Sequence, residues 1–263
     1  MDFQYKEHYD ISDLLKIMKI LRSPDGCPWD KVQTHRSIRQ DFIEETYEVI
    51  EAIDTEDSDL LKEELGDVLL QVVFHSLMEE EKSAFDFDDV CDGVCQKLII
   101  RHPHVFADTV ADTPDEVLKN WDAIKMQTKS QSTVADSVDD VAKSLPALMR
   151  AQKVQKRAAK SGMDFENWQK ALQRAQEEIE ELKAVDPSDK DRLCEELGDI
   201  LFSVVNTARL LKVDAELSLS RSTEKFSSRF RKIEALCRER GIDMETASEE
   251  ELDRLWKEVK QSC

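Results

Sequence analysis

The sequence contains few of the residues that interrupt helices. Only 6 glycines and 6 prolines occur among 263 residues, whereas 36% of the residues are charged and 40% are hydrophobic. This composition is typical of a helix-rich protein with little room for strands. The chain also lacks an apolar run of about 18 residues, and its first ten residues, MDFQYKEHYD, contain no apolar core. We therefore expect neither a membrane-spanning helix nor a secretion signal, and a cytoplasmic location.

Negative charge outweighs positive charge, with 57 acidic residues against 37 lysines and arginines. The formal net charge is −20 at pH 7, and no basic stripe is large enough to overcome the resulting repulsion of polyanions. We therefore expect no nucleic-acid polymer and no membrane as partner. A small anionic substrate can still bind if a divalent cation reverses the local sign of the potential. The six cysteines form no CxxC pair and no zinc-ribbon spacing, which favours reduced thiols.

One short motif occurs twice. The string EELGD stands at residues 63–67 and again at 195–199. A pair of glutamates three residues apart precedes each copy: Glu45 and Glu48, then Glu178 and Glu181. The offset is 133 residues from 45 to 178 and 132 residues from 67 to 199, which is near half the chain length. This pattern predicts a tandem duplication of one structural module.

Apolar periodicity and capping signals predict an all-α fold with two duplicated helical-bundle domains. We expect an N-terminal domain at residues 1–128, a linker rich in Ser, Thr and Asp at 129–144, and a C-terminal domain at 145–263. The predicted helices cover about 11–21, 37–53, 58–78, 87–100, 145–160 and 214–240, with others starting near 113, 165 and 248 and one carrying the second EELGD.

The repeated acids are spaced for metal binding. Two carboxylates at i and i+3 project from the same face of a helix. Only 15 residues separate Glu48 from Glu64, so the two helices are expected to pack as antiparallel neighbours, with Asp67 on the same face as Glu64. Four converging carboxylates repel one another unless a cation lies between them. Oxygen ligands favour Mg²⁺ or Mn²⁺ over zinc, which points to phosphate chemistry.

Each acidic motif is followed by the same basic and aromatic residues. Two cations at i and i+4 come first, and a tryptophan with a lysine one turn later comes next: Lys97, Arg101, Trp121 and Lys125, then Lys225, Arg229, Trp256 and Lys260. The cations are suited to binding phosphate oxygens. A tryptophan taken alone is more often part of a core or an interface than a platform for a base.

These motifs resemble those of the all-α nucleoside triphosphate pyrophosphohydrolases, and most closely the two-domain MazG family. The strings GCPWD at 26–30, RHPHVF at 101–106 and SLPALMRAQKVQKRAA at 144–159 carry the resemblance further. It implies a homodimeric, Mg²⁺-dependent enzyme, with Mn²⁺ as a possible substitute. Such an enzyme converts nucleoside triphosphates of either sugar and of many bases to monophosphates and pyrophosphate, in nucleotide-pool housekeeping.

The resemblance also implies roles for individual residues. The metal ligands carried over to the C-terminal repeat are Glu178, Glu181, Glu196 and Asp199. The nucleotide contacts carried over are Arg174, Arg192, Lys225, Arg229, Trp256 and Lys260. Arg174 and Arg192 stand where a relative has lysines, so the charge is kept while the hydrogen-bond geometry differs. Glu177 and Glu195 either orient or deprotonate the attacking water, or are simply solvated.

The N-terminal repeat differs at two of these positions. It keeps a second, weaker metal site formed by Glu45, Glu48, Glu64 and Asp67. Asp41 and Leu60, however, stand where the other repeat has Arg174 and Arg192, and neither side chain can hold phosphate. We therefore predict that this repeat handles triphosphates poorly and serves in dimerisation, in regulation or in a narrower activity.

Two other functions are compatible with the same motifs. One is a sister enzyme with a different base pocket, either a dimeric dUTPase-like protein or a phosphoribosyl-ATP pyrophosphohydrolase. The other is a helical regulator that binds Mg²⁺ or nucleotide without turnover. Substrate profiling separates the enzymes, and nucleotide binding without pyrophosphate release identifies the regulator.

Overall fold

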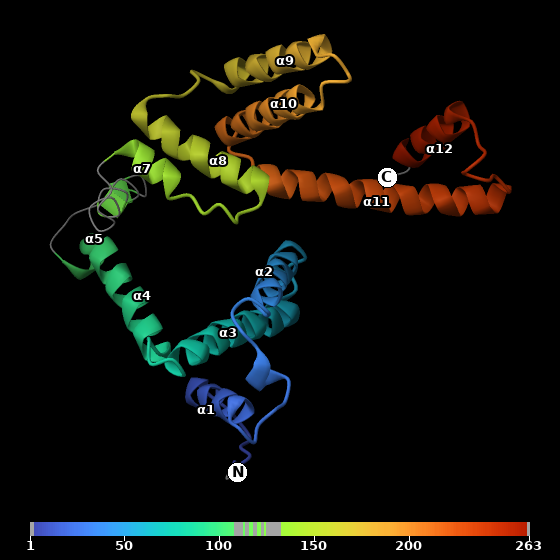
Figure 1. Ribbon diagram of the computed structural model, residues 1–263. Helices are drawn as coiled ribbons and strands as arrows, with labels where there is room; N and C mark the ends of the chain where they lie inside the picture. The colour runs from blue at the N-terminus through green and yellow to red at the C-terminus, as the bar shows by residue number, and fades with distance from the viewer. Residues whose placement is uncertain are drawn as a thin grey trace. The chain divides into compact units, whose positions relative to one another are not determined.

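A computed structural model describes residues 3–107, 113, 116–117, 120–121, 124 and 133–261. Within these ranges the chain forms helices and no strand, which confirms the all-α prediction. The chain divides into two compact units, Met1–Lys125 and Met126–Cys263 (Figure 1). In the described part, none of the helices combines the length and apolar character needed to cross a membrane.

The described helices of the first unit follow the predicted pattern, while most of the helix expected from about residue 113 lies outside the described residues. The described helices are α1 (Ile11–Arg22), the short 3₁₀ helix η1 (Asp30–Val32), α2 (Arg39–Asp54), α3 (Ser58–Glu80), α4 (Phe87–Arg101) and α5 (Pro103–Phe106). Capping explains several of their starts: Asp10 caps α1 and Asp86 caps α4, each in a reciprocal capping box. The predicted break at Pro103 is where α5 begins, because proline is tolerated at the first helical position.

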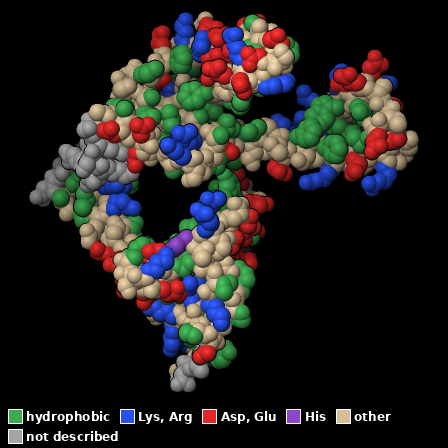
Figure 2. All heavy atoms as spheres, viewed as in Figure 1, with side chains coloured by type: hydrophobic (Ala, Val, Ile, Leu, Met, Phe, Trp, Pro, Cys, Tyr) green, Lys and Arg blue, Asp and Glu red, His purple; other side chains and the backbone are tan. Residues whose placement is uncertain are grey.

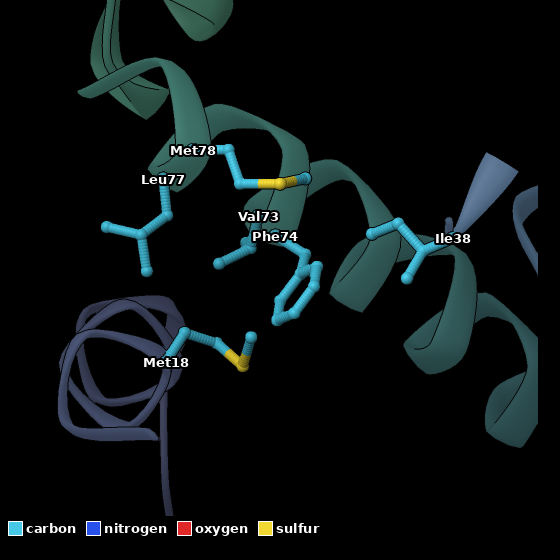
Figure 3. Packing of buried hydrophobic residues seen from close by; sticks show 6 residues of the cluster. All are labelled: Met18, Ile38, Val73, Phe74, Leu77 and Met78. Atoms are coloured by element: carbon cyan, nitrogen blue, oxygen red, sulfur yellow. The ribbon is translucent and has the colours of Figure 1, made fainter. Parts of the chain in front are cut away.

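The core of the first unit lies at the C-terminal half of α3. Six buried apolar side chains form it, and Figure 3 shows them between α1, α3 and the start of α2: Met18, Ile38, Val73, Phe74, Leu77 and Met78. Only residues 55–57 separate α2 from α3, and the two helices pack side by side. The core therefore fixes one end of this helix pair, while the acidic residues lie toward the other end of α3.

The second unit consists of α7 (Val134–Asp139), α8 (Ala147–Ala158), the short η2 (Ala159–Ser161), α9 (Trp168–Ala184), α10 (Lys190–Leu210), α11 (Ala215–Arg240) and α12 (Glu249–Gln261). Gly162 follows η2 with φ of 87°, and Gly241 follows α11 with φ of 68°. Both glycines adopt the left-handed conformation that ends helices. The helix expected from about residue 165 begins at Trp168, because the side chain of Asn167 caps it.

Helix α7 lies inside the segment that we expected to be a linker. Its apolar periodicity is weak, but Thr133 and Asp136 form a reciprocal capping box that starts the helix. It packs against α8, where the Arg157 guanidinium donates hydrogen bonds to the Ser137 carbonyl and to Asp140. The sequence carried this capping signal, which the weak periodicity obscured.

Two glutamines of the SLPALMRAQKVQKRAA string hold α8 against its neighbours. The Gln152 amide donates to the Val213 carbonyl and accepts from the Ala215 N–H, at 2.9 and 3.3 Å. The Gln155 amide donates to the Phe202 carbonyl at 2.7 Å. These bonds fix the corner between α10 and α11, so part of this string has a structural role.

The last helix, α12, packs against α11. Four buried side chains form their shared core, Ile233, Cys237, Leu255 and Val259, and the half-buried Trp256 lies against it. Figure 2 shows hydrophobic side chains gathered where these two helices meet. This packing holds Trp256 beside α11, the helix that carries Lys225 and Arg229.

Candidate metal and nucleotide site

The paired helices α9 and α10 bring acidic side chains of the second unit together. Carboxylate oxygens of Glu178, Glu196 and Asp199 all lie within 4.8 Å of one another. Glu178 and Glu196 are only 5% and 7% exposed, whereas Asp199 and the fourth predicted ligand, Glu181, are exposed. Figure 2 shows acidic side chains gathered over these two helices. Three of the four predicted acids therefore lie together, two of them buried, and Glu181 lies outside this group.

Two arginines partly neutralise this cluster. The Arg174 Nε lies 2.8 Å from a Glu178 oxygen, and the Arg192 Nε lies 3.7 Å from a Glu196 oxygen. Arg174 also reaches Glu181, at 3.5 Å. Burial raises the pKa of Glu178, Arg174 opposes the rise, and the neighbouring carboxylates add to it. The predicted phosphate-binding arginines thus already contact the predicted metal ligands.

The first unit contains the equivalent acidic cluster on α2 and α3. Carboxylate oxygens of Glu45, Glu48 and Glu64 lie within 4.8 Å of one another, and Glu64 is buried. In the described part of the chain, no lysine or arginine forms an ion pair with these acids. Burial, a hydrogen bond with Glu48 and the charge of Asp67 together raise the pKa of Glu45 to about 7. The Glu45 carboxyl is therefore partly protonated near neutral pH.

Both clusters have the donor set of a hard divalent cation. Their ligand atoms are carboxylate oxygens, which suit Mg²⁺ or Mn²⁺ rather than a thiolate-seeking metal. The raised pKa values of Glu45 and Glu178 reflect negative groups held close together in partly dehydrated surroundings. A divalent cation between the carboxylates would remove this repulsion. The residues of both repeats therefore fit a divalent metal.

The predicted nucleotide contacts on α11 and α12 form a second group. The Arg229 guanidinium lies over the Trp256 ring, 5.8 Å from its centroid. The first repeat has the same arrangement, with Arg101 5.7 Å from the Trp121 centroid. Arg229 also has a buried Nε without a hydrogen-bond partner among the described residues. The duplication therefore preserves a cation–aromatic pair in space as well as in sequence order.

These two groups do not contact each other within one chain. Among the described residues, no hydrogen bond or ion pair joins Lys225, Arg229 or Lys260 to any acid of the second cluster. The Glu177 carboxylate accepts from Arg174 at 3.2 Å, and Glu195 is exposed. A part for Glu177 or Glu195 in activating water remains a prediction.

Sequence reasoning missed an aromatic cluster around Trp256. The Phe226 ring lies 5.5 Å from Trp256 and 6.2 Å from Phe230, measured between ring centroids. Phe226 and Phe230 are 56% and 44% exposed. Their i and i+4 spacing, interleaved with Lys225 and Arg229, was the available signal. These side chains enlarge the aromatic surface beside the predicted phosphate-binding cations.

Comparison with known proteins also finds two repeats that each contain an acidic cluster. A family model described as the MazG nucleotide pyrophosphohydrolase domain matches the chain twice, over residues 33–106 and 166–233, and each match contains one acidic cluster. A nucleoside triphosphate pyrophosphohydrolase/pyrophosphatase MazG from Thermotoga maritima is 43% identical over 94% of both chains. A nucleoside triphosphate pyrophosphohydrolase from Escherichia coli is 46% identical over 95% of this chain and 97% of that protein. The chain therefore belongs to the MazG nucleotide pyrophosphohydrolase family.

Proposed function

We propose that this chain is a Mg²⁺-dependent enzyme that hydrolyses nucleoside and deoxynucleoside triphosphates, with a broad base range, to monophosphate and pyrophosphate. The main observation in support is the convergence of Glu178, Glu196 and Asp199, each buried glutamate having an arginine beside it. Carboxylates for a metal and cations for phosphates thus lie together in the second repeat. The family membership and the names of its close relatives point to the same reaction.

The residues of the second cluster have separate parts in this reaction. Glu178, Glu181, Glu196 and Asp199 would hold the metal. A bound Mg²⁺ polarises phosphate oxygens and lowers the pKa of a water molecule. Arg174 and Arg192 are within reach of the same carboxylates, so their guanidinium groups can bind oxygens of a triphosphate held there. Lys225, Arg229, Trp256 and Lys260 supply further phosphate contacts and an aromatic surface.

A homodimer would complete this site. Among the described residues, no hydrogen bond or ion pair joins Lys225, Arg229 or Lys260 to the acids of the second cluster, and the Phe226 and Phe230 rings beside them are exposed. Large apolar side chains are also exposed along α10, at Leu197, Leu201, Phe202 and Val204. A second copy that covers these side chains would bury apolar surface. In the dimer, α11 and α12 of the partner would then supply their cations to the acidic cluster.

The first repeat has a different part in this proposal. Its acids can hold a divalent cation, but Asp41 and Leu60 give it no cation beside the cluster. Without that charge a triphosphate meets only carboxylates and the metal. We assign this repeat to dimerisation, regulation or a narrower activity. The acidic net charge supports an enzyme that acts on free nucleotides rather than on nucleic-acid polymers or membranes.

The test is pyrophosphate release from the four common nucleoside triphosphates and their deoxy forms, with Mg²⁺. Wild type is compared with Glu196→Gln and with the matched change in the other repeat, Glu64→Gln. We expect Glu196→Gln to abolish release and Glu64→Gln to leave most of it. Release from only one nucleotide would favour a sister enzyme with a selective base pocket. Nucleotide binding with no release by wild type would overturn the enzyme proposal in favour of a regulator.

A further inference from the structure

Two histidines and a glutamate meet in the first unit, outside both acidic clusters. His75 and Glu79 are one turn apart on α3, and His75 lies eight residues, or about 12 Å of helix, beyond Asp67. His35 comes from the segment between η1 and α2. The proposed nucleotide reaction uses none of these three side chains.

Their hydrogen bonds define where the ring protons lie. The His35 Nε2 is 2.5 Å from a Glu79 oxygen, and Lys82 donates to the same oxygen at 2.7 Å. Because an ionised carboxylate only accepts, the His35 Nε2 carries a hydrogen. The two Nδ1 atoms of His35 and His75 face each other at 2.7 Å. At most one hydrogen fits between them, so at least one nitrogen lone pair points into the gap.

The surrounding packing keeps the rings in this position. The His35 and His75 rings are nearly parallel, with centroids 5.0 Å apart and an interplanar angle of 5°. The Phe42 ring stacks on His75, with the two ring centroids 5.7 Å apart. A cavity of about 390 Å³ lies beside the rings and is bordered by Phe85 as well. The His35 side chain is 40% exposed, so an ion can reach the pair from solvent.

We propose that His35 and His75 bind a divalent transition-metal ion such as Zn²⁺ through their two Nδ1 atoms, with Glu79 orienting the His35 ring. Neutral imidazole suits Zn²⁺, whereas Mg²⁺ prefers the carboxylate oxygens of the acidic clusters. The hydrogen bond from a ligand histidine to a carboxylate is the usual support for such a ligand.

Metal binding requires the two rings to move apart and to turn. Tetrahedral zinc with bonds of about 2.0–2.1 Å to nitrogen holds two nitrogens about 3.3 Å apart, so the rings must separate by roughly 0.6 Å and swing until both Nδ1 lone pairs point at the ion rather than at each other. Both rings bind the ion as neutral imidazoles with the hydrogen on Nε2: a shared hydrogen held by a protonated His35 leaves to solvent, and one held by neutral His75 is replaced by a hydrogen on the His75 Nε2. Water molecules complete the coordination, because the Glu79 carboxylate stays hydrogen-bonded to Nε2 on the far side of the His35 ring. The ion would tie the segment before α2 to α3.

The test uses the full-length protein, stripped of metal by a chelator and titrated with Zn²⁺ in excess Mg²⁺. The chain has five histidines, so ¹⁵N-histidine NMR resolves each ring. We expect one equivalent of Zn²⁺ to shift the Nδ1 resonances of two rings. His35→Gln and His75→Gln should each abolish these shifts, and His8→Gln, a change of an exposed histidine in the same unit, should leave them intact.

Further results separate the parts of this proposal. Circular dichroism establishes that each variant keeps its helices, and His35→Gln is informative if His75→Gln fails to fold. Glu79→Gln should weaken Zn²⁺ binding about 10–100-fold while the two ring shifts persist. If Glu79→Gln binds Zn²⁺ with unchanged affinity, Glu79 does not position the His35 ring for the metal. Absent ring shifts, or equal Zn²⁺ binding by His35→Gln and wild type, would overturn the metal site itself.

Discussion

Metal binding to the first acidic cluster should release protons in a pH-dependent way. The perturbation is addition of Mg²⁺ to metal-free protein carrying Glu196→Gln, which disables the second cluster. In the first cluster the pKa of Glu45 is raised to about 7 by burial, by its hydrogen bond with Glu48 and by neighbouring carboxylates. A metal binds the deprotonated carboxylate, so any proton held there must leave.

The expected number of protons follows from that pKa. A group with a pKa of about 7 releases ~0.9 proton at pH 6, ~0.5 at pH 7 and ~0.1 at pH 8 on conversion to the carboxylate. Burial also raises the pKa of Glu64, which adds to the release at the acidic end. The characteristic feature is the fall of the proton release with rising pH.

Isothermal titration calorimetry in buffers of different ionisation enthalpy measures this release directly. The slope of the binding enthalpy against buffer enthalpy gives the number of protons. Glu45→Gln should lower the number strongly at pH 6 and 7. The matched change in the other repeat, Glu178→Gln, should leave it unaltered. A release that does not change between pH 6 and pH 8, or that persists in Glu45→Gln, would refute the reasoning.

Three further outcomes are expected. The folded-state pKa of Glu45 lies above the ordinary 4.5, so without metal the contribution of Glu45 to stability is fully present below about pH 4.5 and is lost as pH rises through about 7; urea unfolding in chelator should show this fall as a difference between wild type and Glu45→Gln. Arg174→Ala should lower kcat/KM about 10–100-fold through loss of a charged hydrogen bond, whereas Arg174→Lys should retain part of the rate in the same pyrophosphate assay. Gln152→Ala should lower the free energy of unfolding by about 1–2 kcal/mol, because it breaks both bonds at the α10–α11 corner; the exposed Gln173→Ala is the control in urea unfolding.

The local features of the chain could be predicted from the sequence. Helix positions follow from apolar periodicity and from caps such as Asp10 and Asp86, which act within one turn. The convergence of the acids was also predictable, because i and i+3 carboxylates share a face and a short turn forces α2 against α3 and α9 against α10. The tandem duplication then gave two copies of the same cluster. These properties depend on neighbours in sequence.

Tertiary structure decided how each acid differs from the others. Glu178 and Glu181 are one turn apart, yet packing buries the first and leaves half of the second side chain exposed. The sequence also gave no sign that His35 and His75, 40 residues apart, would meet at 2.7 Å. Burial and long-range contacts depend on how helices pack, and periodicity specifies only which face of each helix is apolar. The sequence by itself therefore determined the helices and the repeated chemistry, while the packing decided which side chains lose water and which distant groups meet.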